Sequence, residues 1–410
     1  MTNADIKYWL RKLEFPNCAR EALVTIGNLC GMPGPPARLQ IQLQTDLMEE
    51  FVFGELAKLK QQKKPSALQE LQLIEVMSTF FRGPERQPAV RNALFLFLYP
   101  AESTRLKILG NLVSLAIATQ NKEVLDSTGM WMQQLGSTSG QSVGLAQHVL
   151  NDFFIYTPNC IEKLRHLPVL VPHFTANLLT AIGEVYKDKD PPNELLKRAG
   201  DWIDENPSLL LTSLMDNPAL PSGGIPMTPI TPIAGLFRWC ILSPARVQTE
   251  NPNERSIDER NKFYSKIQQL LMDSVLRLTN NSNNRHAISA QHLADTTRTL
   301  TVLVQNTGNN AGKALRDLAM ERLAQAVSTA MSANCIYGNK RKFFSCRCIL
   351  STLLFTCHRH PSILTLFGLV TVFCQPFRYI IIVIAHILVY HFLSRCLVAR
   401  YSPVIFFAPF

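Results

Sequence analysis

The chain has 410 residues and a mass of 46.1 kDa, and its 41 Lys and Arg against 31 Asp and Glu give a formal net charge of +10. Hydrophobic residues make up 47% of the sequence, which is enough for a sizeable core and excludes wholesale disorder. Gly and Pro contents exclude collagen-like and low-complexity classes, and ten cysteines are too few for a disulfide scaffold. A charge of +10 suggests nucleic-acid or anionic-membrane binding, but this depends on where the charges lie.

The positive charge is concentrated at one end of the sequence. Residues 337–410, the tail, contain eight Lys or Arg and no Asp or Glu, and the last acidic residue of the chain is Glu321. Residues 1–336, the body, contain 33 basic and 31 acidic residues, a net charge of +2. The tail also holds five of the ten Cys and ten of the 22 Phe. We therefore treat body and tail as different kinds of sequence.

The start of the body indicates no secretory route. Residues 1–7 (MTNADIK) lack a basic region followed by an apolar one, so we expect no signal peptide. The body cysteines are scattered and form no CxxC pair, which favours small core fillers in a reducing compartment, the cytosol or nucleus.

Apolar residues recur at helical spacing throughout the body, and turn-forming residues separate the runs. The clearest run has Leu68, Leu71 and Ile74 on one stripe, and Ser66 with Gln69 fits a capping box at its start. Alternating strand patterns are absent from the body. The predicted helices lie near 16–30, 45–57, 66–81, 88–98, 102–119, 122–136, 141–156, 174–187, 193–204, 208–215, 232–242, 264–278, 287–305 and 323–331.

Helices of this length, joined by short breaks, predict an all-α fold. The rhythm favours an α-solenoid or irregular helical-repeat stack of HEAT/ARM-like type, although no strict repeat recurs at a fixed period. A charged, proline-containing break at 187–192 predicts an N-terminal half over 1–190 and a C-terminal half over 191–336. A polar run at 245–260 predicts a soft linker within the second half, and 337–410 is an atypical hydrophobic tail.

No catalytic motif is found in the body. It has no HExxH, GxSxG or GxGxxG, and Gly308–Ala314 only superficially matches a phosphate loop because its spacing is wrong and it lacks the Ser or Thr. Two sets of neighbouring acidic residues could in principle serve in acid–base catalysis: Asp46, Glu49 and Glu50 on one predicted helix, and Asp201, Asp204 and Glu205 on another. No other candidate catalytic residue accompanies either set, so we expect no catalytic residue, cofactor or metal site.

Two clusters are candidates for binding. Phe237, Arg238 and Trp239 have the composition of a partner-interface anchor, although a buried core Trp is the more common arrangement. A basic loop of four lysines is a possible phosphate contact, but it has no interleaved aromatic residue and a solvated loop is favoured. These lysines are Lys58, Lys60, Lys63 and Lys64.

Two threonine–proline pairs are candidates for modification. Thr228-Pro229 and Thr231-Pro232 could accept phosphate from a proline-directed kinase in a loop. A plain helix start, with Thr231 as the N-cap and Pro232 at the first helical position, explains the second pair equally well.

An ordered set of six segments resembles a known family. The set resembles the fifteenth subunit of the Integrator complex over about residues 1–334. The order and spacing of the six segments carry the resemblance, since none is decisive alone. The segments are 47–53 (LMEEFVF), 68–77 (LQELQLIEVM), 109–114 (LGNLVS), 231–240 (TPIAGLFRWC), 264–267 (YSKI) and 322–326 (RLAQA).

The resemblance implies a non-catalytic helical scaffold. Integrator associates with RNA polymerase II in the nucleus, cleaves nascent RNA including the 3′ ends of small nuclear RNAs, and attenuates transcription. Its catalytic activities belong to other subunits, and the fifteenth resembles an adaptor that joins the tenth, thirteenth and fourteenth. We therefore expect a nuclear protein, present also in the cytoplasm, with protein partners, no small-molecule substrate and no direct nucleic-acid binding.

The tail departs from this resemblance near Asn334 and has two interpretations. Tyr379–Val398 has the length of a membrane span, despite His386, His391 and Arg395, and would make the chain a cytosol-facing helical adaptor anchored to a membrane. The composition shift favours the other interpretation, a retained intron translated to its first stop codon.

A zinc cluster in the tail is disfavoured, because its C-x-C-x8-C-H-x-H spacing does not match structural zinc motifs. The residues concerned are Cys346, Cys348, Cys357, His358 and His360.

Overall fold

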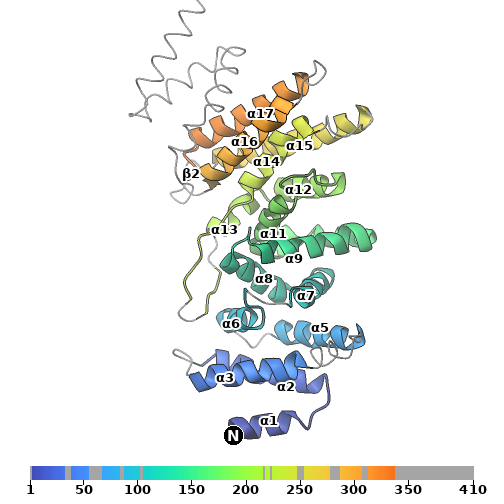
Figure 1. Cartoon of the computed structure of the whole chain (residues 1–410), viewed down its shortest axis with the longest axis vertical. Coiled ribbons are helices and arrows are strands. Elements are labelled where there is room, and N and C mark those ends of the chain that lie inside the picture. Colours follow the sequence, from blue (N-terminus) through green and yellow to red (C-terminus); the bar gives the residue numbers. More distant parts are fainter. Residues whose placement is uncertain are drawn as a thin grey trace, which may run out of the picture. The chain divides into compact units, whose positions relative to one another are not determined.

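The described part of the protein is almost entirely helical in a computed structural model (Figure 1). The chain divides into two compact units, Met1–Cys348 and Ile349–Phe410, and every described residue belongs to the first. The predicted all-α helical stack is confirmed for this unit. The described residues are 2–32, 38–54, 67–83, 87–101, 105–215, 218–221, 224–246, 254–277, 287–306 and 313–337.

The first half of the body begins with a short helix that the apolar pattern does not predict. In it, Thr2 and Asp5 form a capping box. Most of the remaining helices overlap the predicted runs, but α3 begins seven residues before the predicted 45–57, and the short helices η3 and α10 were not predicted. The elements are α1 (Asn3–Leu10), α2 (Asn17–Cys30), α3 (Arg38–Leu47), the π-helical turn η1 (Met48–Val52), α5 (Ala67–Arg82), α6 (Pro88–Leu98), α7 (Leu106–Thr119), α8 (Lys122–Leu135), α9 (Gly140–Leu150), the π-helical turn η2 (Asn151–Tyr156), the 3₁₀ helix η3 (Pro158–Leu164), α10 (Leu167–Leu170) and α11 (Pro172–Val185).

The second half contains longer helices and a minimal strand pair. β1 and β2 are parallel, with Ile288 opposite Ile336, and they hold the end of α17 beside the start of α16. The elements are α12 (Asn193–Glu205), the 3₁₀ helix η4 (Pro207–Leu211), α13 (Thr212–Met215), α14 (Ile233–Arg246), α15 (Glu254–Arg277), β1 (Ile288–Ser289), α16 (Ala290–Asn306), α17 (Lys313–Ser332) and β2 (Ile336–Tyr337).

The helices stack in chain order. α2 packs on α5 and α6, α5 on α7, and α6 on α8, and α8 and α9 then pack on α11. α11 contacts α14, which is surrounded by α15, α16 and α17 (Figure 1). Contacts confined to elements near in sequence are the property that defines a solenoid.

The core runs continuously through this stack. Trp131, Trp202 and Trp239 are each no more than 1% exposed, and many Leu, Ile and Phe side chains surround them. Cys18, Cys240 and Cys335 are buried fillers as predicted, whereas Cys160 is exposed and Cys30 half-buried. Such continuous burial supplies most of the stability of a helical stack.

Small residues allow the central helices to approach closely. A Cβ atom placed on Gly129 of α8 would lie 2.8 Å from the backbone N and Cα of Phe174 in α11. Further along, Gly183 of α11 faces Gly235 of α14, and a Cβ atom placed on either glycine would lie 3.3–3.4 Å from the Cα of the other. These glycines set the spacing of α8, α11 and α14.

The predicted linker is partly wrong. α14 continues to Arg246 and α15 begins at Glu254, so most of 245–260 is helical and only 247–253 lies outside the described residues. The first turns of α15 are polar in sequence, and from Asp258 onward the buried stripe begins at Tyr264 and Ile267. A division of the body at 190/191 stays a prediction.

All of the tail after Tyr337 lies outside the described residues, including its candidate membrane span Tyr379–Val398 and its cysteine–histidine cluster. Within the described residues, none of the helices combines the length and apolar character needed to cross a membrane.

Candidate functional site

Three arginines clamp the loop between α11 and α12. Arg238 Nε donates to the Lys187 carbonyl at 3.1 Å, and Arg246 donates to the carbonyls of Lys187 at 2.5 Å and Lys189 at 3.2 Å. Asp190 lies 3.4 Å from Arg246 and 3.5 Å from Arg260, atom to atom. The loop at the predicted boundary between halves is therefore fixed to α14 and α15.

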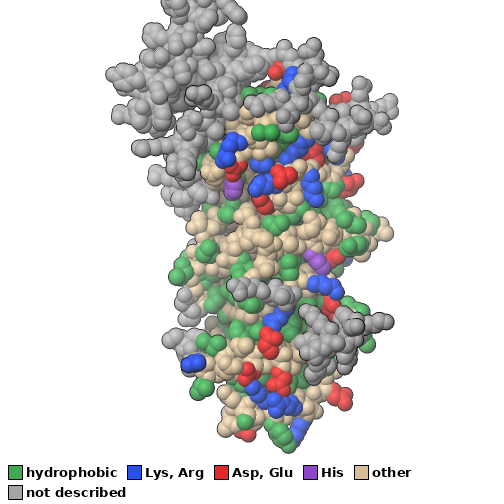
Figure 2. Space-filling model, in the orientation of Figure 1, with side chains coloured by type: hydrophobic (Ala, Val, Ile, Leu, Met, Phe, Trp, Pro, Cys, Tyr) green, Lys and Arg blue, Asp and Glu red, His purple; other side chains and the backbone are tan. Residues whose placement is uncertain are grey.

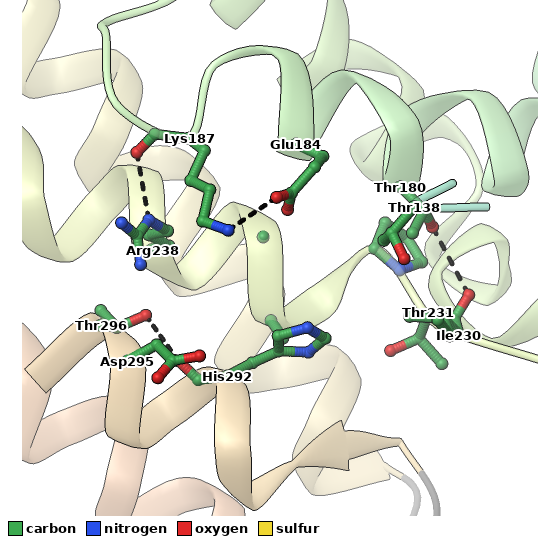
Figure 3. Close-up of a pocket in the computed structure, with 14 residues that line it drawn as sticks. Thr138, Thr180, Glu184, Lys187, Ile230, Thr231, Arg238, His292, Asp295 and Thr296 are labelled. Carbon is green, nitrogen blue, oxygen red and sulfur yellow. Dashed lines mark hydrogen bonds and ion pairs between the residues drawn. The ribbon is translucent and has the colours of Figure 1, made fainter. Parts of the chain in front are cut away.

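A small pocket lies beside this clamp, between α11, α14 and α16 (Figure 3). Glu184 and Lys187 form an ion pair of 2.7 Å at its rim, and Arg238 reaches Thr299 Oγ1 at 3.2 Å. Lys/Arg and Asp/Glu side chains gather together over α14–α16 in Figure 2, as they do over α1–α3. The cavity volume of about 40 Å³ has room for a few water molecules rather than a cofactor.

His292 of α16 is a half-buried titratable group that lines this pocket. Desolvation lowers the pKa of His292, and nearby Glu184 and Asp295 only partly oppose this effect. The imidazole is therefore neutral at physiological pH. Neither carboxylate is free to activate it, because Glu184 pairs with Lys187 and Asp295 pairs with Arg298.

Threonine hydroxyls lining the pocket bond to main-chain carbonyls. Thr180 donates to the Ala176 carbonyl at 2.8 Å, and Thr296 donates to the His292 carbonyl at 2.9 Å. Thr231 is buried and donates to Ala287 O, an arrangement that the predicted N-cap role did not include. None of these three hydroxyls pairs with a base, so the pocket is built as a polar junction between helices.

Arg322 forms a second polar junction, in which the arginine itself is buried. Pro244 lies inside α14 and has no N–H, so the carbonyl of Cys240 loses its helical donor. Arg322 Nη1 donates to that carbonyl at 2.9 Å and to Ser243 Oγ at 3.1 Å, and Nη2 donates to Ser265 Oγ at 3.0 Å. The side chain is 3% exposed and links α14, α15 and α17.

This junction was missed from sequence, although three of the six family-like segments meet there. They are 231–240, 264–267 and 322–326, and they contribute Cys240, Ser265 and Arg322. The available signal was a proline within an apolar helical run together with a cation on the apolar face of another helix. Burial lowers the pKa of Arg322, but guanidinium remains charged at any physiological pH.

The aromatic pair predicted as a possible interface is in the core. Phe237 is 0% exposed and Trp239 is 1% exposed, with the Trp239 ring packed edge-on against Tyr186 at 6.1 Å between centroids. Trp239 is therefore a buried core residue, which is the alternative stated from the sequence, and neither ring is available at the surface. Arg238 lines the pocket, and a partner role for it stays a prediction.

The other sequence candidates fall into two groups. Lys58, Lys60, Lys63 and Lys64 lie outside the described residues, as do Ser66 and Gly308–Gly312. The described residues hold no group of three or more His, Cys, Asp or Glu suited to a metal ion. The suspected carboxylates pair with cations instead: Asp46 with Lys7, Glu49 with Arg105, Glu50 with Arg11, Asp201 and Asp204 with Lys266, and Glu205 with Arg165.

A family model described as Integrator complex subunit 15 matches residues 4–353. The chain belongs to this family. The subunit of Drosophila melanogaster is 32% identical over 344 residues, covering 78% of this chain and 87% of that protein. The Danio rerio subunit is 28% identical over 364 residues, covering 81% and 75%, and the Homo sapiens subunit is 27% identical over 368 residues, covering 81% of each.

The family match runs further than the expected end near Asn334. It reaches residue 353, inside the acid-free segment. The fold agrees, because β2 at Ile336–Tyr337 pairs with β1 and so belongs to the helical unit. The acid-free part of the sequence therefore begins before the folded unit ends, and the predicted boundary between body and tail at 336/337 falls between the two residues of β2. The retained-intron interpretation of the tail stays a prediction.

Proposed function

We propose that this chain is a non-catalytic scaffold subunit of an Integrator complex in the nucleus. Membership of the subunit 15 family over residues 4–353 is the observation that carries the proposal. The helical stack supports it, because solenoids typically act by presenting extended surfaces to other proteins. The pairing of the candidate carboxylates with cations supports a role without chemistry of its own.

The finer proposal is that the chain bridges the tenth, thirteenth and fourteenth subunits. Through them it would support attenuation of transcription by RNA polymerase II and 3′-end processing of small nuclear RNA. Direct RNA binding is not proposed, because the body carries a net charge of only +2 and the described basic side chains form many ion pairs with acids. Such a balanced surface lacks the positive field that binds phosphates.

Pairwise co-expression tests the finer proposal. The full chain would be expressed with the tenth, thirteenth or fourteenth subunit and passed through a size-exclusion column. We expect co-elution with at least one of them at physiological salt. Separate elution from all three, with the chain still helical by circular dichroism, would refute the bridging role.

A membrane-anchored helical adaptor is the second candidate, and only the apolar segment Tyr379–Val398 favours it. Fractionation of cells that express the full chain with an N-terminal tag separates the two. Recovery in the nuclear fraction is the expected result. Recovery in carbonate-washed membranes would favour the anchor instead.

A further inference from the structure

A proline-rich segment between α13 and α14 runs back along the stack. We call residues 218–221 and 224–232 the strap (Figure 1). Asn92 Nδ2 of α6 donates to the Ala219 carbonyl at 2.6 Å, and Gln133 Nε2 of α8 donates to the Met227 carbonyl at 3.4 Å. Thr180 Oγ1 of α11 lies 3.5 Å from the Ile230 carbonyl. The strap therefore touches three successive layers, and its contacts near Met227 and Ile230 are long and weak.

The described residues contain four Ser/Thr-Pro pairs, and the structure separates them sharply. Thr231 is 3% exposed and Ser243 is 0% exposed, so neither hydroxyl can be reached in the folded protein. Thr157 is exposed, but it lies between two helical turns and its hydroxyl donates to the Asp152 carbonyl at 2.5 Å. Thr228 is exposed and lies in neither a helix nor a strand, and its hydroxyl makes no hydrogen bond within the described residues.

We propose that Thr228 is a phosphorylation site for a proline-directed Ser/Thr kinase. Such an enzyme needs the acceptor in an accessible, non-helical segment with proline next in the chain, and only Thr228-Pro229 combines these properties in the described residues. Residues around it can lift from α8 by breaking one weak hydrogen bond, without unfolding a helix. The inference goes beyond the proposed scaffold function and does not depend on it.

The chemistry is ordinary phosphoryl transfer. Thr228 Oγ1 attacks the γ-phosphorus of a Mg²⁺-bound nucleoside triphosphate, the bond between γ-phosphorus and bridging oxygen breaks, and the kinase base takes the hydroxyl proton. The nucleoside diphosphate leaves with the bridging oxygen.

Phosphorylation would change the character of the strap surface. Ile225 and Met227 beside Thr228 are 80% and 50% exposed, so the unmodified surface is apolar. A phosphate adds a charge of about −1.5 to −2 at neutral pH. The modified strap therefore presents an anionic group where the unmodified strap offers apolar side chains to a partner.

The test uses the folded full chain with Ser402→Ala, which removes the Ser-Pro pair of the tail. A proline-directed kinase is first chosen that phosphorylates both Thr228 and Thr231 in a synthetic peptide of residues 222–236. The folded chain is then incubated with that kinase and Mg·ATP, and sites and initial rates are measured by mass spectrometry. We expect phosphorylation at Thr228 at least about tenfold faster than at Thr231, Ser243 or Thr157, because Thr231 and Ser243 are buried, Thr157 is held between two helical turns, and Thr228 lies in an exposed segment that can open locally.

Two variants serve as controls. Thr228→Ala should remove the main phosphorylated species, and Thr228→Ser should restore it, since a serine hydroxyl can accept phosphate at the same place. The proposal is overturned if the folded chain is not modified at Thr228, or if Thr231 or Thr157 reacts as fast as Thr228 in the folded chain.

Discussion

At the scale of single residues, the C-terminal part of the stack depends on a proline and an arginine that compensate one another. Pro244 removes a helical hydrogen bond from α14, and Arg322 of α17 donates to the Cys240 carbonyl at 2.9 Å, beside a longer hydrogen bond of 3.3 Å from Ser243 Oγ. A buried carbonyl without a donor is costly, and a buried guanidinium without acceptors is more so. Each residue is therefore tolerable because the other is present.

Replacing Arg322 by Met should destabilise the protein by about 3 kcal/mol, since the buried Cys240 carbonyl loses its shorter hydrogen bond and Ser243 Oγ and Ser265 Oγ lose the guanidinium as a donor. Chemical unfolding of the full chain, followed by circular dichroism, measures this loss. Arg277→Met at the exposed end of α15 is the matched control and should change the free energy of unfolding by less than about 0.5 kcal/mol.

A double-mutant cycle isolates the compensation. In a Pro244→Ala background the new N–H can donate to Cys240, so the loss caused by Arg322→Met should shrink by about 1 kcal/mol. Equal losses in the two backgrounds would show that Arg322 does not act through the carbonyl that Pro244 frees.

His292 should make stability depend on pH. The folded protein favours the neutral imidazole because burial lowers its pKa, whereas in the unfolded chain the group titrates near the ordinary value of 6.5. The unfolded state therefore takes up the proton first as pH falls, and stability decreases below about pH 6.5. Glu184 of α11, Lys187 in the loop that follows it, Arg238 of α14 and Asp295 of α16 are the charged groups that face it.

Thermal unfolding of wild type and His292→Gln at about pH 7.5 and about pH 5.5 checks this. The variant should lose less stability over that interval than the wild type does. The exposed His166 offers a control, and His166→Gln should keep the wild-type difference. A wild-type difference that His292→Gln leaves unchanged would contradict the assignment.

At the scale of elements, helix packing is set by close backbone contact as well as by apolar stripes. α8 and α11 approach at Gly129, and α11 and α14 at the Gly183–Gly235 pair. Interiors packed at crystal-like density do not absorb an added methyl group where backbone atoms are already in contact.

Gly129→Ala should therefore destabilise the protein by about 1–3 kcal/mol despite the better helix propensity of alanine, because its Cβ would lie 2.8 Å from the Phe174 backbone. Gly140→Ala in α9 is the matched control, since a Cβ there meets nothing within 4 Å. The control should be neutral or stabilising by up to about 1 kcal/mol. Similar melting temperatures for the two variants would refute this view of the α8–α11 contact.

The sequence predicts an element well where one face of it is apolar. α6 is predicted at its observed bounds because turn residues frame a clear stripe, while α1 is missed because only Leu10 of it is buried. The start of α15 is missed because its first turns are polar. β2 is missed because its partner β1 lies far away in the chain, and two residues cannot show alternation.

The site was harder to predict than the fold for the same reason. Arg238 was singled out beside two aromatics, but its partners Lys187, Asp188 and Thr299 belong to other helices and loops. The role of Arg322 depends on Pro244 in a distant helix. Such pairings are tertiary, and no local pattern of residue types contains them.

At the scale of the whole molecule, the net charge of +10 is a poor guide to function. Eight of its units belong to residues 337–410, and the helical body is nearly neutral at +2. The described charged residues are largely paired or bonded to main-chain carbonyls, so they join helices rather than form a positive surface. This distribution of charge agrees with the proposed scaffold role.

Affinity purification of the tagged full chain from nuclear extract, with quantitative mass spectrometry, tests the central claim most directly. We predict recovery of other Integrator subunits in near-stoichiometric amounts, retained after a wash at moderate salt because a scaffold interface is not mainly electrostatic. Recovery of the folded chain without any other Integrator subunit would contradict the account.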